Sequence, residues 1–308
     1  MKTLQQVVAG LDFSSRSFNA LRQAHRMARW DGARCLALHV LDKDVVEDLG
    51  DRVDVSRDEL LTGASRRLSA EVESALGPDH GVETEVVIGH PFRAIVTEVE
   101  RRRAGLLVLG SSGSGDDPAR VGTVAGRCVR KAPVNVLLVR ALAGGSFRRI
   151  VTGVDFSDTA VKAARHAVHI ALRDGAELLF LHIHQPPALM MDDPGYFGTL
   201  DVALMDQFDD ELLASAVEKL KDFARERIEE AGASSLTWRA ETLRHGNVRA
   251  AINEFLQETG ADLAVIGTIG RTGLKSLLLG TTAEKVLHHA PCSVLTVKPD
   301  GFGYEIDG

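Results

Sequence analysis

Residues 7–40, VVAGLDFSSRSFNALRQAHRMARWDGARCLALHV, recur as residues 150–183, IVTGVDFSDTAVKAARHAVHIALRDGAELLFLHI. The two stretches are offset by 143 positions and are identical at fifteen of 34, including an Asp-Phe-Ser tripeptide and an Asp-Gly pair. Two later apolar segments repeat as well: LLVLGSSG (106–113) as LAVIGTIG (263–270), and APVNVLLV (132–139) as APCSVLTV (290–297). The chain therefore contains two copies of one unit.

The repeat predicts two domains, residues 1–143 and 146–300, joined by the flexible sequence AGGS at 143–146. A length of 308 residues suits two domains. The offset grows from 143 to 157 along the repeat, so the second copy carries 14 extra residues after its second strand. We expect this insertion at about 185–210.

Each copy alternates short apolar runs with helix-like segments. Ser14 and Ser157 follow the first run and are expected to cap the next helix, which ends at an Asp-Gly pair. In the second copy that helix has an apolar stripe with helical spacing, formed by Val161, Ala164, Val168, Ala171 and Leu172. Long helices are expected at about 58–76 and 206–231. Apolar strands that alternate with helices predict a doubly wound parallel sheet covered on both faces.

Composition excludes several classes of protein. The chain is 44% hydrophobic with a formal net charge of −7, which argues against general affinity for nucleic acid. The halves differ, because residues 1–145 have net charge +1 and residues 146–308 have −8. No apolar run is long enough for a membrane span or a secretory leader. Three isolated cysteines exclude a disulfide framework, so we expect a cytoplasmic protein.

A glycine-rich segment follows the fourth apolar run of the second copy, GTIGRTGLKSLLLGT (267–281). Glycine allows backbone amides to approach an anion closely, and the start of the next helix favours phosphate. Arg271 and Lys275 add positive charge. Because ligands of doubly wound sheets bind at the carboxyl ends of the strands, Asp155 is expected to face the same crevice.

These motifs resemble the ATP-binding branch of the universal stress protein family. The resemblance is carried by DFS (155–157), LHI (181–183), the pattern G-x2-G-x9-G-T (267–281) and APCSVLTV (290–297). It covers nearly the whole chain twice, and implies two five-stranded sheets of order 3-2-1-4-5. It also implies that the aspartate and the strand-two residue flank adenine and ribose, while the glycine loop holds ribose and phosphates. With Arg271 added for its charge, the expected ATP site comprises Asp155, Ile183, Gly267, Gly270, Arg271, Gly280 and Thr281.

The first copy departs from this pattern in GSSGSGDDPARVGT (110–123). Eight residues rather than nine separate its second and third glycines, and Ser114 replaces the basic residue. Asp116 and Asp117 are expected to repel a triphosphate. The counterparts of the site residues are weaker candidates: Asp12, Val40, Gly110, Gly113, Gly122 and Thr123. We therefore expect one ATP per chain, bound in the second copy.

Structural interpretations stand beside these functional ones. In these interpretations the glycines are required only for tight turns, and Asp12 and Asp155 only for capping. No third ligand accompanies His182 and His184, so no metal site is predicted. The arginine run 101–103 is expected to complement a helix dipole, and the cysteines to lie in the core. The acidic insertion remains open between a loop, a lid over the nucleotide and a subunit contact.

The leading hypothesis is a stress-response module that senses or stores ATP, with or without Mg²⁺. The alternatives are a slow ATPase or nucleotidyl-transfer enzyme and a structural or small-ligand carrier. No catalytic base is identified in the sequence, and enzymatic activity is left open.

The family's single domains pair through the fifth strand, so we expect residues 134–140 and 292–298 to pair as a pseudo-twofold dimer within the chain. Further association into a homodimer is left open; no nucleic-acid or membrane partner is expected.

Overall fold

The computed structural model describes residues 4–52, 55–112, 121–140, 145–186, 202–268 and 281–302. They form two compact units. The first unit contains residues up to 145 together with residues from 293 onward, and the second contains 146–268 and 281–292 of the described residues. The α/β class and the tandem organisation predicted from the repeat are confirmed.

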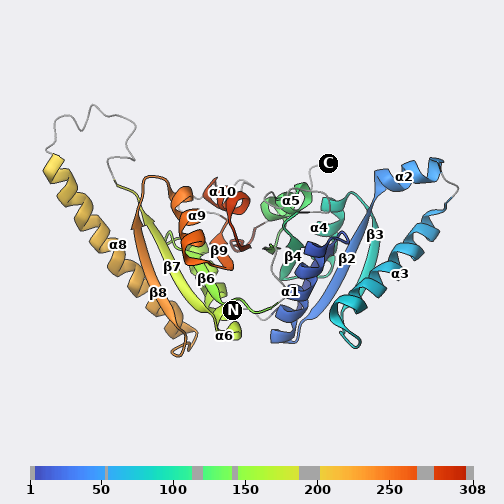
Figure 1. Ribbon diagram of the computed structural model, residues 1–308, viewed down its shortest axis with the longest axis horizontal. Coiled ribbons are helices and arrows are strands. Elements are labelled where there is room, and N and C mark those ends of the chain that lie inside the picture. Colours follow the sequence, from blue (N-terminus) through green and yellow to red (C-terminus); the bar gives the residue numbers. More distant parts are fainter. Residues whose placement is uncertain are drawn as a thin grey trace. The chain divides into compact units, whose positions relative to one another are not determined.

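The first unit alternates strands and helices (Figure 1). Its elements are β1 (Gln6–Leu11), α1 (Ser15–Asp31), β2 (Arg34–Asp42), α2 (Lys43–Arg52), α3 (Arg57–Leu76), β3 (Glu83–Gly89), α4 (Pro91–Arg101), β4 (Leu106–Gly110), α5 (Thr123–Lys131) and β5 (Asn135–Val139). The strand order β3-β2-β1-β4-β5 is the one expected, and these strands are all parallel. Helix α1 packs with α3, and α4 packs with α5. Right-handed crossovers place these pairs on opposite faces of the sheet.

The last strand of the chain, β10 (Ser293–Val297), also lies in the first unit. It pairs antiparallel with β5, with Leu295 opposite Leu137. The hydroxyl of Thr296 donates a hydrogen bond to the Val136 carbonyl at 3.0 Å. The arrangement of the two copies about an approximate twofold axis stays a prediction.

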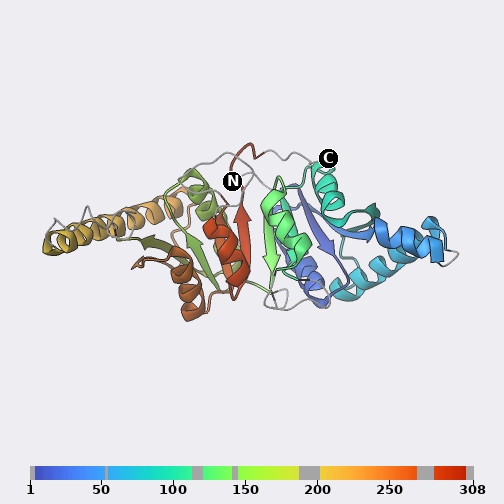
Figure 2. The same cartoon turned by 90° about the horizontal axis from the view of Figure 1, so that it is seen from above.

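The second unit repeats the same alternation. Its elements are β6 (Arg149–Gly153), α6 (Asp158–Asp174), β7 (Glu177–His184), α8 (Val202–Glu230), β8 (Trp238–Arg244), α9 (Val248–Thr259), β9 (Leu263–Gly267) and α10 (Thr281–His289). The order is β9-β6-β7-β8, with parallel pairing from β6 to β9, β6 to β7 and β7 to β8. Helix α8 spans 29 residues and is seen along its length in Figure 2.

The first helix of each unit begins and ends as its sequence predicts. The hydroxyls of Ser14 and Ser157 accept hydrogen bonds from the first-turn amides of Ser17 and Ala160. Both helices end at a glycine in the left-handed conformation, with φ of 64° at Gly32 and 65° at Gly175. A side chain is strained at such a φ, which explains the repeated Asp-Gly pair.

The cores are aliphatic, as the low aromatic content predicts. All six residues of β1 are buried, as expected for a parallel strand with both faces covered. In α6 the predicted apolar stripe is confirmed for Ala164, Val168 and Ala171, which are buried. The prediction is wrong for Leu172, whose side chain is 39% exposed. Leu172 directly follows Ala171 on the helix and so turns about 100° away from the buried face.

All three cysteines are buried, as predicted, and none of them forms a disulfide. Burial raises the pKa of Cys35 and Cys128 to about 12, so these thiols stay protonated at neutral pH. A protonated, buried thiol behaves as a small apolar side chain.

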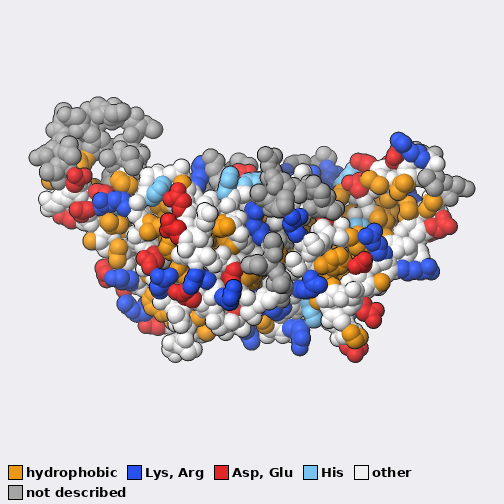
Figure 3. Space-filling model, viewed as in Figure 1, with side chains coloured by type: hydrophobic (Ala, Val, Ile, Leu, Met, Phe, Trp, Pro, Cys, Tyr) orange, Lys and Arg blue, Asp and Glu red, His pale blue; other side chains and the backbone are white. Residues whose placement is uncertain are grey.

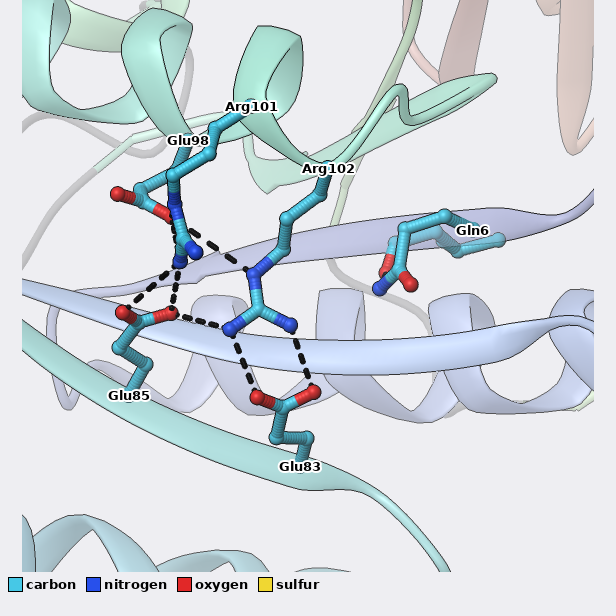
Figure 4. Close-up of polar contacts among 7 residues, drawn as sticks. Gln6, Glu83, Glu85, Glu98, Arg101 and Arg102 are labelled. Atoms are coloured by element: carbon cyan, nitrogen blue, oxygen red, sulfur yellow. Dashed lines mark hydrogen bonds and ion pairs between the residues drawn. The ribbon is translucent and has the colours of Figure 1, made fainter.

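The arginine run after α4 joins that helix to the sheet edge (Figure 4). Arg102 donates two hydrogen bonds to Glu83 at 2.6 and 2.7 Å and one to Glu85 at 2.6 Å, both on β3. Arg101 binds Glu85 at 3.0 Å and Glu98 at 2.5 Å. These bonds raise the pKa of Arg102 and lower that of Glu83. The run is therefore engaged in structure, beyond the helix-dipole role expected of it.

A buried lysine ends the last strand of the first unit. The ammonium of Lys298 donates hydrogen bonds to the carbonyls of Val129 at 2.6 Å and Arg130 at 3.1 Å, near the carboxyl end of α5. Its side chain also lies 4.3 Å from the Phe302 ring centre. Burial nevertheless lowers the pKa of Lys298 to about 7, so part of the population loses this charge at neutral pH.

Replacing Arg102 by Met should lower the free energy of unfolding by about 2 kcal/mol, because Glu83 would lose both hydrogen bonds from the guanidinium and Glu85 would lose one of its two arginine partners. Urea unfolding measures this loss, and Arg103→Met, at an exposed neighbour, is the control. The Glu83 pKa is lowered in the fold, so its contribution exists above the ordinary glutamate pKa and disappears as pH falls. The difference between wild type and variant should shrink toward pH 3, and a difference that persists there would contradict this account.

Lys298 should raise the free energy of unfolding as the pH increases above neutrality, while the buried thiols of Cys35 and Cys128, with their raised pKa, act in the opposite direction. The folded pKa of Lys298 is about 7, against about 10.4 for a free lysine. Between these values the unfolded chain holds the extra proton, so raising the pH favours the folded state by at most about 1.4 kcal/mol per pH unit. Urea unfolding at pH 7.5 and 9.5 should show that the free energy of unfolding of wild type rises relative to that of Lys298→Met, and Lys221→Met should follow wild type. A difference between wild type and Lys298→Met that stays constant with pH would exclude this effect of Lys298.

Candidate functional site

The Asp-Phe-Ser motif forms the turn between the first strand and first helix of each unit. The Oδ1 atom of Asp12 accepts hydrogen bonds from the Ser14 amide at 3.0 Å and hydroxyl at 2.5 Å. Asp155 accepts the same two bonds from Ser157 at 3.0 and 2.6 Å. Each aspartate thus orients the serine that caps the helix, which supports the capping interpretation.

The second carboxylate oxygen differs from the first. Among the described residues, no hydrogen bond or ion pair reaches Oδ2 of Asp12 or Asp155. Asp12 is exposed and Asp155 is half-buried, so both remain open to solvent. Each aspartate can therefore cap its helix through one oxygen and accept a hydrogen bond from a ligand through the other.

The phenylalanine of the motif has an unusual backbone. Phe13 and Phe156 both have φ of 62°, the left-handed region in which a bulky residue is disfavoured by about 1–2 kcal/mol. Their rings lie 4.4 Å from the His39 ring and 4.7 Å from the His182 ring, centre to centre.

A cation completes each aromatic stack from the long helix of its unit. The Arg67 guanidinium lies 4.1 Å from the Phe13 ring centre, and the Lys219 ammonium lies 4.3 Å from that of Phe156. Cation–π contacts of this kind are worth about 0.5–2 kcal/mol. The stack therefore offsets strain in the turn.

The stacked histidines are structural, as predicted. Nδ1 of His39 donates a hydrogen bond to the Leu11 carbonyl at 2.7 Å, and Nδ1 of His182 donates to the Val154 carbonyl at 2.7 Å. Burial lowers the pKa of His39. Each ring holds the end of the first strand beside the second.

The glycines that end the fourth strands are needed for packing. A Cβ on Gly110 would lie 3.1 Å from backbone atoms of Arg16 and Ser17 at the start of α1. On Gly267 it would lie 2.8 Å from Cγ2 of Thr159 at the start of α6. The conformational interpretation is thus supported for both, and these glycines also bring strand and helix together at the expected binding edge.

Parallel strands bring the remaining described candidates to the same edge of their units. Val40 and Ile183 lie near the ends of β2 and β7, and Ile183 is 8% exposed. Gly122 precedes α5 and donates its amide to the Ser111 carbonyl at 2.8 Å, while Thr123 and Thr281 begin α5 and α10. Gly113, Gly270, Arg271 and Gly280 lie outside the described residues, as do Asp116, Asp117 and most of the insertion.

One buried hydroxyl at this edge lacks a partner. Ser112 follows β4 by two residues and is 3% exposed, and its Oγ has no hydrogen-bond partner among the described residues. An unsatisfied buried hydroxyl is costly unless something else binds it.

Two clusters escaped the sequence analysis. Nε2 of His184 lies 2.7 Å from Oδ1 of Asp209, whose Oδ2 lies 3.2 Å from Nε of Arg244. These residues come from β7, α8 and β8. Asp209 lies 25 positions after His184 and 35 before Arg244, so no short sequence motif contains the cluster. The second cluster is Asp42, Asp44 and His90, for which an Asp-x-Asp at a strand end was the available signal.

Comparison with known proteins identifies the family. Its description is "Universal stress protein family", and it matches residues 3–140 and again 146–298. The chain belongs to the universal stress protein family. None of the described helices of this universal stress protein is long and apolar enough to cross a membrane.

The relatives agree with a tandem architecture. Universal stress protein MJ0531 of Methanocaldococcus jannaschii is 33% identical over 153 residues, which cover 49% of this chain and 82% of that protein. YxiE of Bacillus subtilis is 29% identical over 152 residues, covering 49% of this chain and 99% of YxiE. Each of these proteins aligns with about half of this chain.

A solved structure has the same fold along nearly the whole chain. A universal stress protein from Archaeoglobus fulgidus aligns with a TM-score of 0.60 and 18% identity, covering 95% of this chain and 96% of that one. At this identity the likeness establishes the fold.

Replacing Gly267 by Ala should destabilise the protein by about 2 kcal/mol through the clash with Thr159. Thr159→Ser removes the nearest atom, so the double variant should regain about half of the lost free energy of unfolding, measured in urea as a double-mutant cycle. Gly153→Ala is the matched control, since a Cβ there would meet only Ile266, at 3.7 Å. A neutral Gly267→Ala, or no recovery in the double variant, would contradict the packing role.

Proposed function

We propose that this universal stress protein binds one ATP, in its second copy, and senses or stores the nucleotide rather than turning it over. The site comprises Asp155, Ile183, Gly267, Gly270, Arg271, Gly280 and Thr281. The proposal rests on the carboxylate of Asp155, whose two oxygens have different roles. Its Oδ1 caps a helix through Ser157, while no bond among the described residues reaches its Oδ2, at the sheet edge where Gly267 meets α6.

The chemistry of these residues fits a nucleoside phosphate. A carboxylate oxygen accepts hydrogen bonds from sugar hydroxyls or a base amino group. Ile183 offers an apolar surface at the end of β7, and helix α10 begins at Thr281, where unpaired amides favour phosphate. Arg271 adds positive charge, and a bound Mg²⁺ would neutralise phosphate charge.

The first copy is proposed to bind nucleotide weakly or not at all. Asp12, like Asp155, bonds to a serine through Oδ1 and leaves Oδ2 open, and the buried hydroxyl of Ser112 after β4 has no hydrogen-bond partner among the described residues. The loop is one residue shorter, however, and contains Asp116 and Asp117 where phosphate charge needs compensation. We infer that this copy, residues 1–143, has a mainly structural role beside the binding copy, residues 146–300.

Assembly and location are proposed from the sequence. The fifth-strand segments 134–140 and 292–298 are aliphatic and are expected to pair within the chain. The absence of disulfides among the three cysteines fits a reducing cytoplasm.

Replacing Gly270 by Asp should weaken ATP binding at least tenfold, about 1.4 kcal/mol, because a carboxylate and a Cβ enter the phosphate loop. Gly113→Asp makes the same change in the first copy and should alter affinity less than twofold. Isothermal titration calorimetry measures both, with one site expected per wild-type chain. The nucleotide should be recovered as ATP after incubation.

Two results would contradict the proposal. Two equal sites would show that the first copy is intact, and unchanged affinity in Gly270→Asp would show that the loop does not touch ATP. Thermal unfolding with and without ATP supplies a second readout, because a ligand that binds only the folded state raises the melting temperature.

A further inference from the structure

Three potential metal ligands meet at the carboxyl ends of two neighbouring strands in the first unit. Asp42 ends β2, Asp44 is the second residue of α2, and His90 lies between β3 and α4. Their ligand atoms all lie within 4.8 Å of one another. The strand register explains the meeting, since Asp42 pairs with Gly89, the residue before His90. Figure 3 shows acidic and histidine side chains together at the surface beside α2.

Among the described residues, no cation pairs with the carboxylates of Asp42 and Asp44. Oδ1 of Asp42 accepts the Asp44 amide at 3.0 Å, and within the described part of the chain neither carboxylate forms an ion pair. The lysine between them, Lys43, pairs instead with Glu47 at 3.6 Å. Two like charges about 4 Å apart repel by about 1 kcal/mol even in water, and a bound cation replaces that repulsion with attraction.

The imidazole has no competing role. His90 precedes α4 as its N-cap, but its side chain makes no capping bond. Within the described ranges the ring has no hydrogen-bond or ion-pair partner, and it is exposed. An accessible imidazole beside two carboxylates is a donor set that metal ions recognise.

The donor set selects the class of ion. Mg²⁺ and Ca²⁺ prefer oxygen ligands, whereas imidazole suits first-row transition ions such as Zn²⁺. Three protein ligands leave at least one position for water or another ligand. Asp42 is half-buried while Asp44 and His90 are exposed, so an ion can enter from solvent.

We propose that Asp42, Asp44 and His90 form a binding site for a divalent first-row transition-metal ion, with Zn²⁺ as its representative. The inference is independent of the proposed ATP site, which lies in the other copy. It adds a ligand site that the sequence analysis did not predict, because the three residues meet only through strand register.

The second copy provides an internal control. The 143-residue offset that aligns β2 with β7 puts Gln185 and Pro187 at the positions of Asp42 and Asp44. His245 follows β8 as His90 follows β3, but its Nδ1 accepts the Asn247 amide at 2.9 Å. The second copy thus keeps a histidine and lacks both carboxylates.

Zn²⁺ titration of tag-free, metal-stripped protein, in competition with a chromophoric chelator, tests the site. Wild type should bind one Zn²⁺, and His90→Ala and Asp42→Asn should each weaken that binding at least tenfold. His245→Ala should change it less than twofold. Melting curves without metal should be similar for all four proteins, since these side chains are not in the core. Millimolar Mg²⁺ should not displace Zn²⁺.

Co²⁺ supplies a second readout, because its visible absorption reports coordination by the protein. The spectrum of the wild-type complex should be lost in His90→Ala and kept in His245→Ala. The proposal is overturned if wild type binds no Zn²⁺, if His90→Ala and Asp42→Asn keep wild-type affinity, or if Mg²⁺ displaces Zn²⁺ at equal concentration.

Discussion

The left-handed phenylalanine of the Asp-Phe-Ser turn is the constraint on which each unit depends. It reverses the chain between the first strand and the first helix, and so sets where that helix begins. The conformation is unfavourable for a bulky residue, but ring stacking on a histidine and contact with a cation hold it. The same turn presents the aspartate, so the strained backbone and the proposed ligand contact are parts of one feature.

The glycines at the ends of the fourth strands have a packing role as well as a place in the proposed binding site. Gly110 and Gly267 would be required even in a protein without a ligand, because a side chain there meets the start of the first helix of its unit, α1 or α6. That requirement explains why the first copy keeps this glycine although its loop has changed. The two copies therefore share this framework, and their sequences differ in the charge and length of the glycine-rich loop.

Periodicity and repetition predicted most of the fold. The serine caps and the glycine ends of α1 and α6 agree with the structure because each depends on local chemistry, whereas the order β3-β2-β1-β4-β5 was implied by the family resemblance. Helix α2 was not predicted, since its ten residues are mostly polar. Of the proposed ATP site, the sequence pattern indicated Asp155 and the resemblance indicated Ile183, but neither predicted that one oxygen of Asp155 bonds to Ser157. The clusters around His184 and His90 depend on strand register, which no motif records.

The position of β10 has a consequence for synthesis of the chain. This strand comprises residues 293–297 yet completes the sheet of a unit whose other strands end at residue 139. While the ribosome is making the second copy, the first can form its local helices and strands, but the outer edge of β5 must wait until residues 293–297 have been made. An exposed strand edge is a site for pairing with other chains. The nascent protein is therefore open to misassembly for as long as the second copy is being made, and chaperone protection would matter most at that edge.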